Sequence, residues 1–460
     1  MGEIFDQLRN IALIVLIIFC ILTGKEYDRL PIQEDGTRNM EFSRFGRKMT
    51  CNAGILSLMD DLGKALLSGG EDMIMMGGGN PGVVPEFRET VQKRLRAICD
   101  DASLFHQLTG VYGPLCGDHG FVEGLATLLN REHGWDVGPE NICLTNGSQT
   151  AFFYLFNLFG GLYEDGFRKK ICLPLAPEYI GYADLGLEEE LFVTTRPRIE
   201  YLDDGMFKYR VDFDELAIGD DIGAICVSRP TNPTGNVVTD REVEKLSGLA
   251  EEKNIPLIID SAYGLPFPCM VYTDARPVWN KNTIVCLSLS KLGLPAIRTG
   301  IVVADEKVVK ALGSMNAIMS LTPTSVGATL MREIVKSGEI GRISHDLIQP
   351  FYKAKMENAV TAVREQFVDI PCRIHKPEGA MFLWLWFEDL PVSSLELYER
   401  LKKRGVLVVS GHYFFPGLQG AWKHKDECLR VTYAQDDDAV TKGIGIIAEE
   451  VKRSYSTSPL

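Results

Sequence analysis

Short runs of consecutive apolar residues alternate with longer segments of helical periodicity through the centre of the chain. Six runs predict buried strands: 141–145 (NICLT), 170–173 (KICL), 224–228 (AICVS), 257–260 (LIID), 283–287 (TIVCL) and 300–304 (GIVVA). They lack polar alternation, as parallel strands do when both faces of their sheet are covered. Helical segments such as Asp240–Asn254, which Thr239 is placed to cap, lie between them. This alternation predicts a large α/β domain with a mostly parallel sheet and covering helices.

The C-terminal part has a different pattern. Helical periodicity at 347–367, 394–404 and 440–454 is interrupted by strand-like segments at 380–387 (AMFLWLWF) and 428–433 (CLRVTY). This mixture predicts a smaller α+β domain, formed with the N-terminal arm. The predicted boundaries are a leader over 1–39, an N-terminal arm over 40–90, a large domain over 91–330 and a small domain over 331–460.

The leader contains an unbroken apolar run, Ile11–Leu22. The run is shorter than the ~20 residues that a transmembrane helix needs. It also lacks the basic start and the small-residue cleavage site of a signal peptide. Two interpretations stay open: a mis-assigned start, with translation beginning at Met40, or a membrane anchor. We favour the first.

Composition narrows the classes of partner. The 460 residues are 45% hydrophobic and 24% charged, as in ordinary globular proteins, and the net charge is −14. An acidic chain disfavours nucleic acid or an anionic membrane surface as the main partner. The 11 cysteines form no CxxC pair, and the seven histidines show no metal-ligand spacing. We therefore expect no metal, and reduced thiols in a cytoplasmic protein.

Two loops follow predicted strands and carry candidate ligand groups. The segment 146–150 (NGSQT) opens a helical stretch, so free backbone N–H groups and the helix dipole there suit a phosphate. The alternative is a simple turn in which Ser148 caps the helix. The segment 229–235 (RPTNPTG) is a rigid loop that fixes the amide of Asn232, although it too could be an ordinary turn.

Two further strands end in ionisable residues. Asp260 ends the strand LIID, and Tyr263 follows three residues later. A carboxylate there needs a cation, which a pyridinium nitrogen would supply; a turn-capping aspartate is the alternative. Lys291 follows the strand TIVCL within Ser288-Leu289-Ser290-Lys291, and Arg298 comes seven residues later. Burial and a nearby cation lower the pKa of a lysine toward that of an imine-forming amine, whereas an exposed lysine would stay inert.

The order of these segments along one sheet is more specific than any of them alone. NGSQ, NPTG, D-x-x-Y, S-x-S-K and a later arginine resemble the class I/II aminotransferases, which have the pyridoxal 5′-phosphate (PLP) fold type I. The resemblance extends from Met40 to the C-terminus. Longer runs resemble the valine–pyruvate aminotransferase subgroup: 75–81 (MMGGGNP), 144–159, 174–192 (PLAPEYIGYADLGLEEELF), 226–237, 288–300 and 375–391.

The resemblance implies a role for each matching residue around the cofactor ring. Lys291 would hold PLP as a Schiff base and carry the proton of the substrate Cα. Asp260 would pair with the pyridine nitrogen, and Tyr179 would stack on the ring. Asn232 and Tyr263 would hydrogen-bond to the ring 3′-oxygen.

The resemblance also implies a phosphate site and a substrate site. The phosphate would be surrounded by Ser148, Gln149, Ser288, Ser290 and Arg298. Tyr112, in YGPLCG, would reach the phosphate of a neighbouring subunit, which predicts a homodimer. Arg430 would clamp the substrate α-carboxylate, Asn232 would lie beside it, and Gly79 would let the N-terminal segment approach the substrate.

One departure from the family pattern concerns the phosphate loop. In many members the arginine follows the lysine at an offset of eight, with a glycine two before the arginine; here the offset is seven and Ala296 takes the place of the glycine. The shorter offset agrees with the valine–pyruvate subgroup. The alanine makes the geometry of this loop an open question.

The resemblance implies transamination of valine with pyruvate, which gives 2-oxoisovalerate and alanine. A different PLP reaction on the same scaffold stays open, such as C–S β-elimination or decarboxylation, as does a different amino donor. A PLP-sensing transcription regulator is disfavoured, because the residues before Met40 are too few and too apolar for a DNA-binding domain. A membrane-tethered enzyme would require the leader to act as an anchor.

Overall fold

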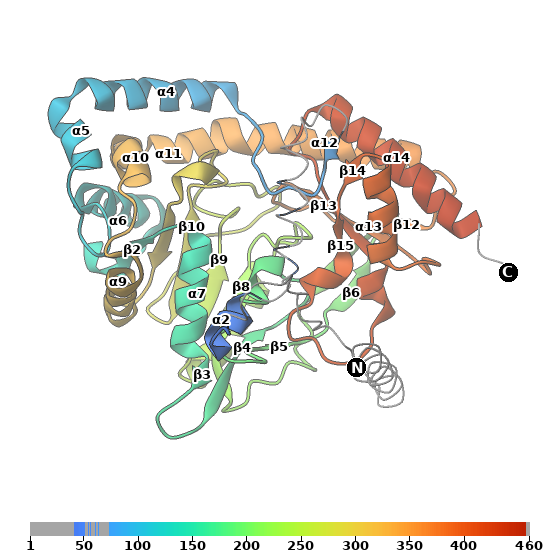
Figure 1. The fold of residues 1–460 in the computed structure, drawn as a ribbon, viewed down its shortest axis with the longest axis horizontal. Helices are drawn as coiled ribbons and strands as arrows, with labels where there is room; N and C mark the ends of the chain where they lie inside the picture. Colours follow the sequence, from blue (N-terminus) through green and yellow to red (C-terminus); the bar gives the residue numbers. More distant parts are fainter. Residues whose placement is uncertain are drawn as a thin grey trace, which may run out of the picture. The chain divides into compact units, whose positions relative to one another are not determined.

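The computed structural model describes residues 41–50, 54, 56, 60, 63 and 73–456 (Figure 1). The chain divides into two compact units, 1–53 and 54–460. In the first unit a short helix, α2 (Arg44–Met49), is capped by the Ser43 side chain. The leader and its apolar run lie outside the described residues. No helix within the described part of the chain combines the length and apolarity that crossing a bilayer requires.

The larger sheet of the second unit has eight strands. In spatial order these are β2 (Ile142–Thr145), β11 (Gly300–Val303), β10 (Thr283–Ser288), β9 (Leu257–Asp260), β8 (Ile222–Ser228), β4 (Arg168–Leu173) and β3 (Gly161–Leu162), with β5 (Phe192–Thr194) also paired to β4. All six predicted strands are present. β11 is antiparallel to both its neighbours and β3 is antiparallel to β4, whereas β8, β9, β10, β4 and β5 pair in parallel.

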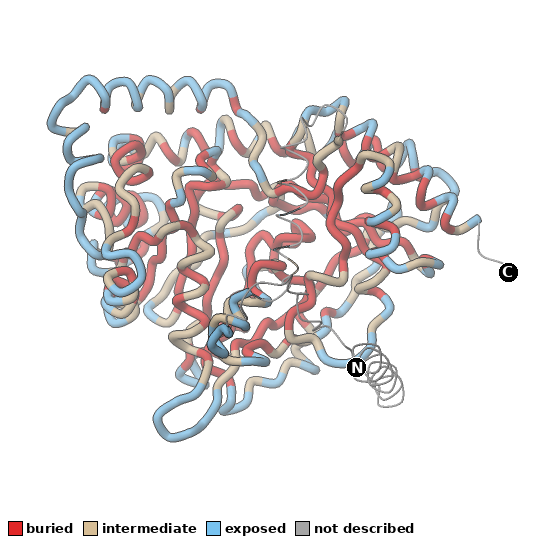
Figure 2. The backbone as a smooth tube through the Cα atoms, in the orientation of Figure 1, coloured by how far each residue is buried: buried red, intermediate tan, exposed pale blue. Residues whose placement is uncertain are grey.

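Helices cover both faces of this sheet, because the apolar residues of its central strands point alternately to one face and to the other. Val285 and Leu287 of β10 pack into a core with α6 (His119–His133), α10 (Val326–Lys336) and α12 (Gln349–Gln366). Ile284 and Cys286 face the opposite core, with α7 (Ser148–Phe159) and α9 (Glu306–Ser320). Buried backbone runs through the centre of the sheet, while much of α4 (Pro85–Asp100) and α5 (Ala102–Thr109) is exposed (Figure 2).

A second sheet of six strands is centred on the C-terminal part. Its order is β15 (Val409–Ser410), β16 (Cys428–Thr432), β13 (Phe382–Phe387), β12 (Cys372–His375), β7 (Met206–Arg210) and β6 (Arg198–Tyr201). Strands β6 and β7 of this sheet lie within 91–330, the segment predicted to form the large domain. The domain boundaries proposed from the sequence remain a prediction. Close to the start of the described segment 73–456, β1 (Ile74–Met75) pairs in parallel with β14 (Val406–Leu407).

Three further helices agree with predicted segments: α8 (Asp240–Glu252), α13 (Ser394–Lys403) and α14 (Asp437–Ser456). The short helix α11 (Glu339–Arg342) was not predicted. Thr239 caps α8 as expected, in a reciprocal box with Glu242. The long helical pattern predicted at 347–367 corresponds to α12, which a π-helical turn, Ile343–Ile348, precedes.

Candidate active site

The ends of β8, β9, β10 and β2, with the start of β11 between the last two, bring the candidate residues to one edge of the larger sheet. Ser228 at the end of β8 pairs with Asp260 at the end of β9, and Ser288 at the end of β10 pairs with Gly300. Gly300 in turn pairs with Thr145, which ends β2. Ligands of parallel α/β sheets bind beyond such strand ends. The register therefore makes this edge the candidate site.

Lys291 lies in the turn that follows β10. Its Nζ donates a hydrogen bond to the carbonyl oxygen of Gly79 at 2.6 Å and lies 5.2 Å from the centre of the Tyr263 ring. Burial lowers the pKa of Lys291 to about 8, and the positive charge of Arg430 acts in the same direction. The amine is therefore available in its neutral, nucleophilic form close to neutral pH. A Cβ at Gly79 would lie 3.5 Å from Nζ, an ordinary van der Waals distance, so the close approach of this segment to a substrate stays a prediction.

Asp260 is a buried carboxylate at the end of β9. Its Oδ1 accepts a hydrogen bond from the N–H of Ala262 at 2.9 Å, and its Oδ2 accepts one from the Tyr182 hydroxyl at 2.6 Å. Burial raises its pKa, while these two hydrogen bonds and the charge of Lys291 oppose that shift. A cationic ring nitrogen placed against Asp260 would compensate the cost of burying its charge.

A second buried carboxyl group lies behind Asp260. Glu178 is fully buried; its Oε1 accepts the N–H of Ser228 at 2.9 Å, and its Oε2 lies 2.5 Å from the Ser228 hydroxyl oxygen. That hydroxyl lies 3.3 Å from the Tyr182 hydroxyl, which contacts Asp260. None of these three residues stands out in the sequence as a functional residue. The acidic residue inside the apolar segment PLAPEYIGY was the one signal available.

The phosphate turn is built around Gly147. Its φ is 90°, and a Cβ at this position would overlap the Arg298 guanidinium, so only glycine fits there. Ser148 is the first residue of α7 rather than its cap, because Gly147 occupies the cap position. The Ser148 hydroxyl donates to the Leu287 carbonyl at 3.4 Å, which ties the helix to the end of β10.

The other predicted phosphate residues flank this turn. Arg298 follows a short 3-10 turn, Pro295–Ile297, and adopts a left-handed conformation with φ 55°. The Ser290 N–H donates to the Ser288 hydroxyl at 3.1 Å, and both serines are buried. The Gln149 amide is used differently, since its Nε2 donates to the carbonyl of Gly181 at 3.0 Å.

Arg430 and Asn232 contact each other, although they come from different sheets. Arg430, on β16, is 2% exposed, and its Nη1 donates to the Asn232 side-chain oxygen at 2.8 Å. Its Nη2 donates to the Gly77 carbonyl at 2.6 Å, while its buried Nε has no hydrogen-bond partner. The guanidinium lies 4.3 Å from the Phe382 ring centre and 5.3 Å from that of Phe414. A buried guanidinium with an unused donor suits a carboxylate ligand.

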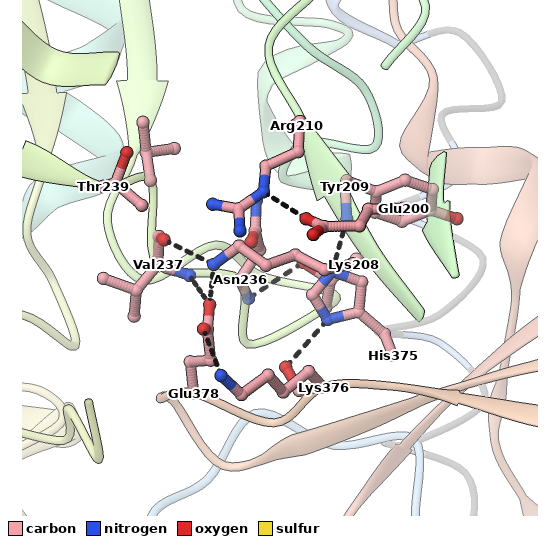
Figure 3. A network of polar contacts seen from close by, with 12 residues as sticks. Glu200, Lys208, Tyr209, Arg210, Asn236, Val237, Thr239, His375, Lys376 and Glu378 are labelled. Carbon is pink, nitrogen blue, oxygen red and sulfur yellow. Dashed lines mark hydrogen bonds and ion pairs between the residues drawn. The ribbon is translucent and has the colours of Figure 1, made fainter. Parts of the chain in front are cut away.

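A buried ion pair contacts the chain just after the Asn232 loop (Figure 3). Lys208 on β7 contacts Glu378, and the exposed fractions of their side chains are 3% and 5%. Lys208 Nζ also donates to the carbonyl of Val237 at 3.0 Å, and Glu378 accepts the Val237 N–H at 3.2 Å. Gly235 also packs closely against the segment 375–380, which contains Glu378: a Cβ at Gly235 would lie 2.5 Å from a backbone carbonyl oxygen of that segment. The second sheet thus holds the end of this loop.

The two remaining tyrosines have different environments. Tyr179 is half-buried and packs edge-on against Tyr182, with ring centres 5.4 Å apart. Burial raises the pKa of its hydroxyl, as does the negative charge of Asp260, while the charges of Arg430 and Arg298 oppose that shift. Tyr112 is 80% exposed, as a residue that serves a neighbouring subunit would be. Its predicted role stays a prediction.

The residues present fit PLP in three respects. Asp260 is a buried anion suited to a ring nitrogen, and Lys291 is an amine of lowered pKa on the same edge. The turn at Gly147 joins a helix start to the Arg298 guanidinium, which suits a phosphate. No cluster of metal-ligating side chains occurs among residues 41–50 and 73–456 or the four isolated described positions.

Comparisons with known proteins agree with this geometry. The family described as "Aminotransferase class I and II" matches residues 72–447. A valine–pyruvate aminotransferase from Escherichia coli (strain K12) is 50% identical over 419 residues, which cover 91% of this chain and 100% of that protein.

Two solved structures are similar over most of the chain. A putative amino-acid aminotransferase from Psychrobacter arcticum 273-4 has a TM-score of 0.88 and 46% identity, covering 91% of this chain and 100% of that one. The valine-pyruvate aminotransferase AvtA from Salmonella typhimurium LT2 has a TM-score of 0.81 and 48% identity, covering 88% and 100%. The expected α/β architecture of PLP fold type I is confirmed.

Proposed function

Because the chain belongs to the class I and II aminotransferase family, we propose that it transfers the amino group of L-valine to pyruvate, giving 2-oxoisovalerate and L-alanine. Aminotransferases act on an amino acid and a 2-oxo acid, and those of this fold use PLP. The choice of valine and pyruvate is supported by the 50% identity to the Escherichia coli enzyme across its whole length. The proposed chemistry is supported by Lys291 and Asp260 at one edge of the larger sheet and by Arg430, which comes from the second sheet and contacts Asn232.

The cofactor, when bound, supplies an electron sink that weakens the bonds at the substrate Cα. Lys291 would hold the cofactor and then move the Cα proton through its Nζ, for which a pKa of about 8 is suitable. Asp260 would hold a proton on the ring nitrogen through its buried carboxylate. Asn232 and Tyr263 would bind the ring 3′-oxygen, and Tyr179 would cover the ring face.

The remaining residues would bind phosphate and substrate. Ser148, Ser288, Ser290 and Arg298 would hold the phosphate around the turn at Gly147; Gln149, whose amide contacts Gly181, would border it. Arg430 would bind the substrate α-carboxylate through its guanidinium, exchanging its hydrogen bonds to Asn232 and Gly77 for bonds to the substrate. Gly79 would leave room for the substrate beside Lys291.

We further propose that the active unit is a homodimer. Val111, Tyr112 and Leu115 expose apolar surface, and Ile318 and Met319 at the end of α9 do the same. The two segments are linked by a hydrogen bond from Asn316 to the Leu115 carbonyl, at 2.8 Å. The α9 end also borders the phosphate turn, where Asn146 Nδ2 donates to Ser320 at 3.0 Å. A second copy covering this surface would bring its Tyr112 toward the turn.

A donor screen tests the proposed substrates. Initial rates are measured for valine, alanine, 2-aminobutyrate, aspartate and glutamate with pyruvate or 2-oxoisovalerate as acceptor. Valine, alanine and 2-aminobutyrate should be efficient, since an apolar pocket separates substrates that differ by one methylene by only ~1–3 kcal/mol. Acidic donors should be slow, because their second carboxylate would be buried without a partner.

Controls distinguish the assignment of the chain as an aminotransferase from the choice of its substrates. Lys291→Ala should abolish transfer, whereas Lys310→Ala, on the exposed face of α9, should not change it. An aspartate or glutamate rate ten times that of valine would contradict the substrate choice and leave the aminotransferase assignment intact. Release of pyruvate from cysteine-type substrates without amino transfer would instead favour a β-lyase.

A further inference from the structure

Glu178 is a fully buried acid directly behind the candidate site, and the proposed mechanism does not use it. It lies in the segment between β4 and β5, and its N–H donates to the Phe414 carbonyl at 2.8 Å. Its carboxyl group points at Ser228, whose strand β8 is next to that of Asp260. A fully buried carboxyl group is costly unless every polar atom finds a partner.

When Asp260 is ionised, as a partner of a cationic ring nitrogen must be, counting hydrogens fixes the direction of the contacts between Glu178 and Asp260. The Tyr182 hydroxyl has one hydrogen, which it donates to Asp260 at 2.6 Å. In its 3.3 Å contact with Ser228, Tyr182 can therefore only accept, so Ser228 must donate. The single hydrogen of Ser228 is then used, and its 2.5 Å contact with Glu178 needs a hydrogen from Glu178.

An ionised Glu178 would break this chain. Ser228 would then have to donate to Glu178, and its lone pairs would face those of Tyr182. As long as Asp260 is ionised, all three contacts are satisfied together only when Glu178 is a neutral carboxylic acid; the opposite direction would need a proton on Asp260. Burial raises the pKa of Glu178 to about 8; hydrogen bonds from Ser228 and the Tyr179 N–H oppose this rise, and the negative charge of Asp260 adds to it.

We propose that Glu178 is a positioning residue whose neutral carboxylic acid starts a one-directional hydrogen-bond chain through Ser228 and Tyr182, and that this chain stabilises the ionised carboxylate of Asp260 opposite the ring nitrogen of the cofactor. Each donor in such a chain polarises the next, so the Tyr182 hydroxyl becomes a stronger donor to Asp260. This inference rests on the proposed function, because it concerns the cofactor that the aminotransferase would use.

The test measures cofactor binding rather than turnover. Dissociation constants of the cofactor-free protein are measured by fluorescence for PLP and for its 1-deaza analogue, in which a C–H group replaces the ring nitrogen. The ratio of the two constants isolates the contribution of the ring nitrogen. Tyr182→Phe should reduce the preference for PLP about tenfold, because it removes a hydrogen bond to a charged group. Ser228→Ala and Glu178→Met should reduce it about three- to tenfold, because they act through Tyr182.

Glu178→Gln is the matched control. Its amide can donate to the Ser228 hydroxyl and accept the Ser228 N–H, so the chain keeps its direction and the preference for PLP should stay within about twofold of that of the unmodified protein. Circular dichroism verifies folding, and Ser228→Ala carries the test if Glu178→Met does not fold.

A merely structural role would weaken both ligands equally and leave the ratio unchanged, and that outcome would overturn the proposal. The same holds if Glu178→Gln behaves like Glu178→Met. Failure of the valine–pyruvate assay with the expected ratios intact would contradict the substrate choice alone.

Discussion

At the scale of single residues, burial raises the pKa of Asp260, and two hydrogen bonds oppose that rise. Asp260→Asn keeps the shape of the side chain but cannot carry the charge that holds a proton on a ring nitrogen. We expect the variant to retain PLP through Lys291 and to turn over about 10²- to 10⁴-fold more slowly. Steady-state kinetics with valine and pyruvate, beside an absorbance spectrum of the bound cofactor, measure both effects.

The matched control is Asp305→Asn, which changes a carboxylate that caps α9 away from the site. Its turnover should be that of the unmodified protein. If Asp260→Asn were as active as this control, the role given to Asp260 would be wrong.

Glu178 predicts a pH dependence of stability. Its pKa is about 8 in the folded protein, above the usual value near 4.5, so between these values the folded state holds a proton that the unfolded state has lost. The free energy of unfolding should therefore fall with rising pH across this window, by at most ~1.4 kcal/mol per pH unit from this group. Glu178→Gln should make that slope shallower; denaturant titrations of the cofactor-free protein at pH 5 to 8 measure it. An unchanged slope would show that Glu178 is ionised in the folded protein.

At the scale of elements, the contact between β7 and the loop after β8 depends on the Lys208–Glu378 pair. Glu378→Gln leaves the buried Lys208 without its carboxylate and should lower the free energy of unfolding by about 3–5 kcal/mol. Because the pair holds Val237, PLP affinity should fall as well. Urea denaturation and a PLP titration measure the two changes.

Glu200→Gln is the matched control on the same sheet (Figure 3). Glu200 pairs with Arg210 at 2.6 Å, but its side chain is 41% exposed, so its loss should cost about 0–1 kcal/mol. A double change of Lys208 and Glu378 to methionine and leucine should cost less than Glu378→Gln alone, since no unpaired charge is left buried. Equal costs for Glu378→Gln and Glu200→Gln would refute the importance of this buried pair.

At the scale of the whole molecule, the apolar surface beside the phosphate turn predicts self-association. Ile318→Asp places a charge in that surface, where Ile318 is 82% exposed, and should shift sedimentation equilibrium toward a monomer of lower PLP affinity. Val368→Asp, at a residue 61% exposed after α12, is the matched control and should sediment as the unmodified protein does. A fully active monomer at assay concentration would contradict the dimer.

The sequence by itself determined the central strands and the residues at their ends. Strand existence and the approximate bounds of β8, β9 and β10 followed from apolar runs, because a sheet covered on both faces needs apolar side chains at every position. Asp260 and Lys291 could be found for the same reason: an ionisable group next to such a run stands out from its local pattern. These features depend on residues that are close together in the chain, so the local sequence pattern is enough to predict them.

Only the tertiary structure decided which distant segments meet. The antiparallel direction of β11 and the pairing of β7 with β12 leave no local signal, because strand direction and partner are set by packing across the sheet. The segment that contains Glu178 and Tyr182 has the composition of an ordinary core segment. The contacts of these two residues with Ser228 and Asp260 form only when β4, β8 and β9 come side by side. The hydrogen-bond direction that makes Glu178 a neutral donor depends on this three-dimensional arrangement, since each hydroxyl has only one hydrogen to give.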